Sequence, residues 1–435
     1  AVGFALTILV GALVLMLPVS AADGQITPFL DALFTAASAS CVTGLVTVST
    51  AVHWSVFGKC VILLLIQIGG LGFMSVAAIA SFVLRRTITL HERMVMSAGL
   101  NLSDGGGIVR LTRRVLFGTF IIEGAGAILL SCRFVPHYGF PKGITMGVFH
   151  AVSAFCNAGF DLMGTPDDPF QSLIGWAEDP LVNITVMALI VLGGLGFFVW
   201  SDVWDKHSFR RLRLHTKIVL TATAGLLLFG FGWTLLFEWS NPATLGAFDT
   251  PHKLLAAAFE SVTLRTAGFN TIDLGALTGP SQAVSCLLMF IGGSPGSTAG
   301  GIKTVTAAVL VLTAISAFCG RTTVSAFGRT IAPRSIMNAV TLLMAGGVLC
   351  LVGACAIAGI EDAPFHQCLF EAVSAFGTVG VSMGLTPTLA AASRVILIVM
   401  MYMGRVGVLT LGVAVFMRRR EPPRLKYPDA DVFIG

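Results

Sequence analysis

The chain has very little charge. Only 11% of its 435 residues are Asp, Glu, Lys or Arg, whereas a soluble domain carries about 25%. Hydrophobic residues make up 55% of the chain and the mean hydropathy is +0.88. This composition excludes a soluble enzyme, a disordered protein and a nucleic-acid-binding protein. It predicts an integral protein of the plasma membrane that spans the bilayer several times and contacts membrane lipid along its sides.

Motifs of enzyme chemistry are also missing. None of the nine cysteines stands in a CxxC pair, and the nearest two, Cys350 and Cys355, lie within one apolar stretch. This pattern indicates core thiols rather than disulfides or a metal site. The eight histidines form no HExxH pair, and no GxxxxGK[ST] phosphate loop is present. The sequence therefore argues against an enzyme, a nucleotide-driven pump and a bound organic cofactor.

What the chain does have is long apolar runs and 49 glycines. Eight runs approach or exceed the ~20 residues needed to cross a bilayer, near 1–18, 56–84, 114–132, 181–203, 216–238, 281–318, 336–359 and 393–417. Four shorter runs lie between them, at 28–41, 145–156, 251–265 and 364–377. These are too short to span and are typical of re-entrant segments. The first run lacks a preceding basic region, so we interpret it as a membrane helix rather than a signal peptide.

The short segments resemble one another. They read FTAASASCVTGL (34–45), FHAVSAFCNAGF (149–160), FESVTLRTAGF (259–269) and FEAVSAFGTVGV (370–381). Each has a phenylalanine, a hydroxyl residue and then a glycine, and the four glycines, Gly44, Gly159, Gly268 and Gly380, recur every 109 to 115 residues. The following long run carries a second marker, which reads IGGLGF (68–73), LGGLGF (192–197), IGGSPGS (291–297) and MGRVGV (403–408). A fixed period of this kind indicates a repeat architecture.

The predicted fold is therefore an all-α membrane protein with four tandem helix–pore-helix–helix repeats around a pseudo-four-fold axis and eight transmembrane helices. The repeats are predicted at 1–84, 112–203, 215–318 and 335–417, followed by a cytoplasmic tail at 418–435. Nineteen of the 27 Lys and Arg residues lie in the connections between repeats or in the tail, which places those segments in the cytoplasm. Ten acidic residues are predicted on the outer side, where they would concentrate cations: Asp23, Asp161, Asp167, Asp168, Glu178, Asp179, Asp249, Asp273, Glu361 and Asp362.

The repeated glycines predict a selectivity filter. A short helix that ends inside the membrane presents a partial negative charge at its C-terminus, and glycine permits the backbone to return with its carbonyls exposed. Rings of carbonyls can replace the hydration shell of a monovalent cation. The predicted filter residues, which would bind a dehydrated monovalent cation, are Val42, Thr43 and Gly44; Asn157, Ala158 and Gly159; Thr266, Ala267 and Gly268; and Thr378, Val379 and Gly380.

Two further positions recur in the short segments. The hydroxyl residues Ser38, Ser153, Thr263 and Ser374 are expected to bond local carbonyls rather than ions. The position after each phenylalanine is variable and holds Thr35, His150, Glu260 and Glu371. We expect these side chains to bond free backbone N–H groups near the filter, with a direct ion site as the alternative.

The third repeat predicts a gate. Residues 292–301 cannot form a stable helix, because glycine costs about 1 kcal/mol and proline about 3 kcal/mol in a helix interior. Non-helical backbone at membrane depth is tolerated where it lines a cavity. The predicted gate comprises Gly292, Gly293, Ser294, Pro295, Gly296, Ser297, Thr298, Ala299, Gly300, Gly301, Lys303 and Arg405. Arg405 stands in an apolar run and is expected to donate to the loop's carbonyls.

These motifs, above all GGSPGSTAGGIKT (292–304), resemble the Trk/Ktr/HKT superfamily of potassium transporters, and the similarity runs over essentially the whole chain. With four repeats and a short tail, the chain is most similar to the KtrB-type membrane subunit. Gly44 differs from the serine often found there in HKT-type sodium uniporters. The resemblance implies potassium uptake, commonly activated by sodium. It also implies a homodimer with one pore per protomer, a cytoplasmic ring of nucleotide-binding regulatory subunits, and a gating role for the loop and Arg405.

One alternative function remains at this stage. A sodium- or proton-coupled secondary cation transporter of the same superfamily would also need many spans, but such transporters usually carry inverted repeats and a midplane acidic relay. Glu123, in the run TFIIEGAGAIL, is the one acidic residue that the sequence places within a long apolar run without a role.

Overall fold

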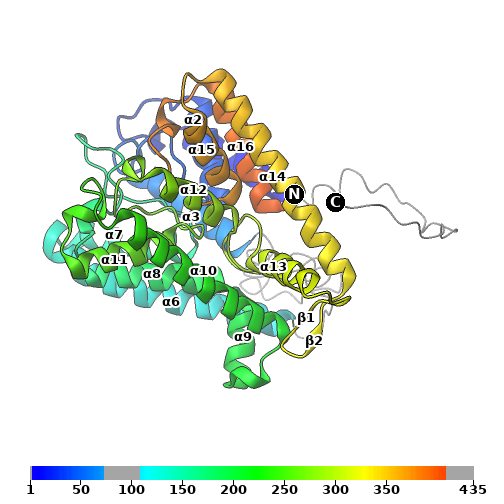
Figure 1. Ribbon diagram of the computed structural model, residues 1–435. Helices are drawn as coiled ribbons and strands as arrows, with labels where there is room; N and C mark the ends of the chain where they lie inside the picture. The colour runs from blue at the N-terminus through cyan, green and yellow to red at the C-terminus, as the bar shows by residue number, and fades with distance from the viewer. Residues whose placement is uncertain (1, 73–107, 408–435) are drawn as a thin grey trace.

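The computed structural model describes residues 2–72 and 108–407. Its helices are α1 (Val2–Leu15), α2 (Phe29–Cys41), α3 (Val56–Leu71), α6 (Ile108–Tyr138), α7 (Phe140–Phe155), α8 (Pro180–Leu195), α9 (Phe197–Lys206), α10 (Leu214–Glu238), α11 (Thr250–Thr263), α12 (Gly279–Phe290), α13 (Thr304–Phe318), α14 (Pro333–Ile360), α15 (Phe365–Gly377) and α16 (Ala391–Val406). A hairpin of β1 (Ser325–Ala326) and β2 (Arg329–Thr330) joins α13 to α14 (Figure 1). The tail at 418–435 and the ends of the runs 56–84 and 393–417 lie outside the described residues.

Three of the described helices are long and apolar enough to cross a bilayer on their own. They are α6, over Thr112–Tyr138, α10 and α14. The pair α8 and α9 passes the same test together but is bent by 91°, and α1, α2, α3 and α13 are shorter apolar helices of 10 to 17 residues. Helices therefore cover most of the described part of the predicted runs, whereas residues 291–303 of the run 281–318 form none.

The break between α8 and α9 corrects one expectation. The sequence predicted a continuous run over 181–203, but the chain turns at Gly196, whose φ is +95°. The helices α3 and α16 end in the same way, at Gly72 with φ +79° and Gly407 with φ +90°. Each is the last glycine of a GGLG-like marker, and positive φ is readily adopted only by glycine. The run predicted over 181–203 is therefore interrupted at its marker glycine.

The helices pack in a closed circle. The short helices α2, α7, α11 and α15, which match the predicted short segments, are largely buried. Each contacts the second helix of the preceding group: α3 packs on α7, α8 on α11, α12 on α15, and α16 on α2. The contact between α16 and α2 brings the end of the described chain back to its beginning. The small residues of the short helices permit this close packing around one centre.

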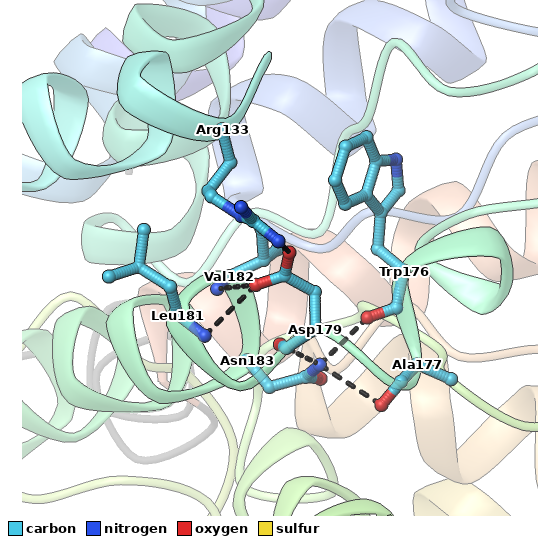
Figure 2. A network of polar contacts seen from close by, with 7 residues as sticks. All are labelled: Arg133, Trp176, Ala177, Asp179, Leu181, Val182 and Asn183. Atoms are coloured by element: carbon cyan, nitrogen blue, oxygen red, sulfur yellow. Dashed lines mark hydrogen bonds and ion pairs between the residues drawn. The ribbon is translucent and has the colours of Figure 1, made fainter. Parts of the chain in front are cut away.

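A polar network fixes the N-terminal end of α8 (Figure 2). The Asp179 carboxylate accepts hydrogen bonds from the N–H groups of Leu181 and Val182, at 3.0 and 3.1 Å, and so caps the helix. Arg133 of α6 donates from Nε to the same carboxylate at 2.7 Å. The Asn183 amide donates to the carbonyls of Trp176, Ala177 and Asp179. This network ties the loop before α8 to α6.

Candidate ion pathway

The chain reverses in the same way after each of the four short helices. A residue in the left-handed region comes first: Val42 (φ +59°), Asn157 (+59°), Thr266 (+71°) and Thr378 (+52°). Two residues later comes a glycine with positive φ: Gly44 (+101°), Gly159 (+68°), Gly268 (+85°) and Gly380 (+94°). A residue with a Cβ pays about 1–2 kcal/mol for the left-handed conformation. Its occurrence at four equivalent places indicates that the surrounding packing imposes one backbone path on all four segments.

The four glycines meet in a ring. A methyl group built on Gly44 would lie 3.0 Å from Gly159 Cα, and one on Gly159 would lie 2.7 Å from Gly268 Cα. A methyl on Gly268 would lie 2.6 Å from the carbonyl oxygen of Val379, and one on Gly380 would lie 2.8 Å from Gly44 Cα, which closes the ring. Because Cβ contacts under 3.0 Å are not tolerated, each segment approaches its neighbours as closely as backbone can.

Carbonyl oxygens crowd the same place. The oxygens nearest to the built methyl groups belong to the middle residue of each segment: Thr43, Ala158, Ala267 and Val379. The predicted filter residues are therefore brought together at one point by four segments that are far apart in sequence. Four carbonyl dipoles at such a point favour a cation over an anion.

Side-chain hydroxyls hold each segment to its own short helix. Ser153 donates to the Phe160 carbonyl at 2.7 Å, Thr263 to Phe269 at 2.6 Å, and Ser374 to Val381 at 2.6 Å. The fourth hydroxyl, of Ser38, accepts from the Gly44 N–H at 3.0 Å. The expected bond to a local carbonyl is therefore confirmed for Ser153, Thr263 and Ser374, whereas Ser38 bonds a backbone N–H instead. Three of the bonds span the glycine of their segment, and the fourth ends on it.

The variable position behaves differently from repeat to repeat. His150 accepts from the Leu162 N–H at 3.3 Å, and Glu371 accepts from the Met383 N–H at 3.2 Å, as expected. Glu260 is 1% exposed, and neither of its carboxyl oxygens has a hydrogen-bond partner among the described residues. The hydroxyl of Thr35 also lacks one there. The expected bond to the backbone is therefore wrong for these two residues.

A cavity of about 230 Å³ opens on one side of the ring. The four glycines line it, together with residues that follow them in each segment. Of the ten acidic residues predicted on the outer side, Asp161 and Asp273 line this cavity. Others serve the helices instead, because Asp179 and Asp249 cap α8 and α11, and Glu361 accepts from the Ala390 N–H. The predicted acidic mouth is thus reduced to two carboxylates.

The non-helical loop lies on the opposite side of the ring. Residues 292–301 form no helix, as predicted. A methyl group on Gly300 would meet Thr378 Oγ1, and one on Gly292 would lie 3.2 Å from Thr266 Cγ2. The Thr298 hydroxyl lies 3.4 Å from Asn157 Oδ1. The loop therefore touches the residue two positions before the glycine in three of the four segments.

The loop is bonded to the broken end of α8. Ser294 N–H donates to the Gly194 carbonyl at 3.0 Å, and Thr298 N–H donates to Gly193 at 3.3 Å. In return, the Phe197 N–H at the start of α9 donates to the Gly296 carbonyl at 2.9 Å. Carbonyls left open at a helix end need such partners. The loop thus occupies a fixed place between α8 and the ring.

Arg405 bridges the loop and α3. One guanidinium nitrogen donates to the Thr298 carbonyl, and another donates to the carbonyls of Gly69 and Gly70. The expected contact with the loop is therefore present. Lys303 donates from Nζ to the Ala299 carbonyl at 2.7 Å, at the end of the same loop.

Arg265 is a third cation at this loop, and the sequence pattern did not predict it as a site residue. It is 6% exposed and donates from one nitrogen to the Gly292 carbonyl, at 3.2 Å, and from another to the Thr223 carbonyl of α10, at 3.5 Å. It directly precedes Thr266 in the chain. One signal in the sequence could have identified it: Arg265 is a basic residue inside a short apolar segment. At the equivalent position the other three segments have Cys41, Cys156 and Gly377.

Glu123 lies away from the ring. Its carboxylate accepts from Gln67 Nε2 at 3.2 Å, and the thiol of Cys156 lies 3.8 Å from it. These contacts join α6 to α3 and α7, and the hollow that Glu123 lines is otherwise formed by residues of the same three helices. Among the described residues, its contacts therefore link helices, and it does not line the cavity at the ring.

An apolar helical shell around a ring of four backbone segments, with a cavity above and a bonded loop below, defines a membrane transport protein for ions. The chain belongs to the TrkH family, described as cation transport proteins, whose family model matches residues 8–421. It is a multi-pass protein of the plasma membrane.

Similar sequences support this family assignment, and a solved structure shares the fold. The chain is 40% identical over its whole length to the potassium/sodium uptake protein NtpJ of Enterococcus hirae, and 42% identical over its whole length to the Ktr system potassium uptake protein B of Bacillus subtilis, in each case covering 96% of the relative. The structure superposes on the potassium transporter TrkH from Vibrio parahaemolyticus with a TM-score of 0.73 at 16% identity, covering 95% of this chain and 83% of that one. This likeness concerns the fold.

Proposed function

We propose that the protein takes up potassium across the plasma membrane through the ring of the four glycine segments. The observation that carries the proposal is that Gly44, Gly159, Gly268 and Gly380 meet at the base of one cavity. Backbone carbonyls at that point would replace the water of a K⁺ ion, and the two carboxylates of the mouth would raise the local cation concentration. The relatives named for potassium uptake support the choice of ion.

The architecture that goes with this function has four repeats around the ring and eight membrane crossings. Each repeat would consist of an outer helix, a half-membrane helix that ends at the ring, and an inner helix broken at its marker glycine. The circle of contacts among α2, α7, α11 and α15 and their neighbours supports this assignment. In this orientation the basic connections between repeats face the cytoplasm.

The loop and Arg405 form the proposed gate below the ring. Residues 292–301 lie across the path that an ion would follow after the filter, and Arg405 holds the loop by its Thr298 carbonyl. A cationic guanidinium at this point also repels cations. When the loop withdraws, the path opens.

We further propose that the chain acts as a homodimer under the control of a separate nucleotide-binding subunit, and that sodium activates uptake. The names of the Ktr relatives, which belong to multi-component systems, support a partner. Titration calorimetry of the purified chain with ATP and NAD should show no binding in the micromolar range. Micromolar binding to the chain alone would contradict this division of labour.

The filter assignment is tested by Gly268→Ser. A side chain there would press on the Val379 carbonyl, so we expect the Km for potassium to rise, or the preference for potassium over sodium to fall, by about tenfold, which corresponds to about 1.4 kcal/mol. The measurement is potassium uptake in an uptake-deficient strain. Gly384→Ser is the matched control. Gly384 also has a positive φ (+89°) and lines the same cavity, but it has open space around it. Equal effects of the two variants would contradict the assignment.

A further inference from the structure

A basic hollow lies at the start of the long helix α10, far from the ring. It has a volume of about 450 Å³ and is lined by Arg210, Arg211, Leu212, Leu214, Lys217, Phe327 and Arg329. The first five belong to the turn before α10 and to its first residues, and the last two belong to the hairpin of β1 and β2. Figure 1 shows this hairpin beside α9 and the start of α10. Two connections whose lining residues are at least 110 positions apart in sequence therefore build one site.

The hollow has four positive charges and no carboxylate on its wall among the described residues. Lys217 is held in place, because its Nζ donates to the Arg210 carbonyl at 2.9 Å and lies 5.8 Å from the ring centres of Phe209 and Phe327. The nearby acid Asp202 is already engaged by Lys206, at 2.9 Å, and by the Arg213 N–H, at 2.8 Å. In the described chain, the guanidinium groups of the hollow therefore make no ion pair of their own.

Exposed aromatic side chains lie on the hollow and in the segments next to it. Phe327 lines the hollow and is 50% exposed, and Phe209, 48% exposed, has its ring centre 6.1 Å from that of Phe327. Trp204 of α9 is 75% exposed, and Phe318 at the end of α13 is 91% exposed. Exposed aromatic residues of this kind gather at the membrane–water interface. The wall of the hollow itself combines apolar and basic residues, with Leu214 and Phe327 beside the arginines. A ligand with a phosphate and an apolar body would match both.

We propose that this hollow binds the headgroup phosphate of an anionic phospholipid of the cytoplasmic leaflet. The phosphate accepts hydrogen bonds from Arg210, Arg211 and Arg329, and the upper part of an acyl chain lies along Leu214 and Phe327. Basic pockets at the cytoplasmic end of membrane helices suit such headgroups. The choice of leaflet rests on the orientation in the proposed function. The bound lipid joins the connection before α10 to the connection after α13.

The experiment compares two double variants of the full chain purified in detergent. Arg210→Gln with Arg329→Gln removes two charges from the hollow. Arg321→Gln with Arg334→Gln removes two exposed charges that do not line it, one from the connection after α13 and one from the start of α14. Phosphatidylglycerol, phosphatidylcholine and inorganic phosphate are added separately. Retained lipid is counted by native mass spectrometry, and the shift in Tm is recorded.

We expect phosphatidylglycerol to be retained and to raise the Tm of the parent chain and of the control. The hollow variant should bind it about 25-fold more weakly, since each basic residue near a membrane surface contributes about fivefold. Equal effects of phosphatidylcholine and phosphatidylglycerol would overturn the proposal. So would an equal rise in Tm with inorganic phosphate, which would indicate a site for soluble anions.

A third result would also overturn it. If the hollow variant kept its phosphatidylglycerol but lost binding of the regulatory subunit, the basic hollow would be a docking surface for protein. None of these readouts depends on ion flux, so a failure of the glycine test above would leave the lipid result interpretable on its own.

Discussion

Three cationic side chains hold the carbonyls of one loop. Arg265 bonds Gly292 at its start, Arg405 bonds Thr298 in its middle, and Lys303 bonds Ala299 near its end. Within the described chain they donate to neutral carbonyls, so each cation is stabilised by several weak dipoles rather than by one charge. A hydrogen bond from a charged group contributes about 1.5–3 kcal/mol. The loop is therefore held strongly enough to stay in place, yet through bonds that a conformational change can exchange one at a time.

Arg265 should connect the third filter segment to the loop, because it precedes Thr266 and bonds Gly292. We expect Arg265→Met to change both the potassium-to-sodium selectivity and the flux by about threefold or more. The change removes the bonds to the Gly292 carbonyl of the loop and to the Thr223 carbonyl of α10, each of about 1.5–3 kcal/mol. Arg265→Lys should restore part of the effect, because an ammonium can still reach one carbonyl. The measurement is flux of both ions into proteoliposomes. Normal selectivity in Arg265→Met would show that the residue only fills space.

Asp161 should make uptake depend on external pH. Burial raises the pKa of its carboxyl to about 6, although the hydrogen bond from the Met163 N–H lowers it. The carboxyl is therefore charged above pH 6 and neutral below it. As the external pH falls from 7.5 to 5.5, the mouth loses a negative charge and the Km for potassium should rise roughly three- to fivefold.

Asp161→Asn should show the high Km at every pH. The exposed Asp167, which does not line the cavity, supplies the control, and Asp167→Asn should keep the pH dependence of the parent chain. A pH step that persists unchanged in Asp161→Asn would mean that another group titrates.

At the scale of elements, the loop between α12 and α13 is the part of the proposed gate that could change position, between lying across the ion path and being withdrawn from it. It satisfies open carbonyls of α8 and receives Arg405, and its glycines leave little intrinsic preference for one shape. Deleting residues 294–298, or replacing Arg405 by Ala, should raise ion flux severalfold and weaken the dependence on a regulatory subunit. Selectivity should persist in both variants, because the loop lies below the ring.

The measurement is flux into proteoliposomes with and without the partner subunit. Arg321→Ala, an exposed arginine remote from the loop, is the control. If both variants folded and dimerised normally but carried less current, the loop and Arg405 would belong to the conducting path rather than to a gate.

The elements also show how far the sequence could lead. The short helices were predictable, because a phenylalanine, small residues and a glycine recur at a fixed spacing, and the hydroxyl bonds followed from local chemistry. The turns at Gly72, Gly196 and Gly407 were not, since glycine in an apolar run is equally typical of close helix packing. Arg265 was missed because one basic residue in one copy breaks the pattern of the repeat. The fates of Glu260 and Glu371 diverge for the same reason, since their partners lie in loops whose sequences differ.

At the scale of the whole molecule, the proposed pathway depends on the closed circle of helices. Each of the four glycine segments packs against the next one, and together they form one ring. No single repeat therefore contains the proposed filter. The ring separates a mouth with two carboxylates from a loop held by three cations. In the proposed function, this asymmetry of charge would attract cations on one side and control their exit on the other.

The most direct measurement is anomalous diffraction from crystals grown with rubidium or thallium in place of potassium. If the ring is the filter, we expect an anomalous peak inside it, within coordination distance of the carbonyl oxygens of Thr43, Ala158, Ala267 and Val379. Crystals of Gly268→Ser should lose this peak. A peak that lies elsewhere in the protein, at Glu123 for example, with none in the ring of either crystal, would contradict the proposed pathway.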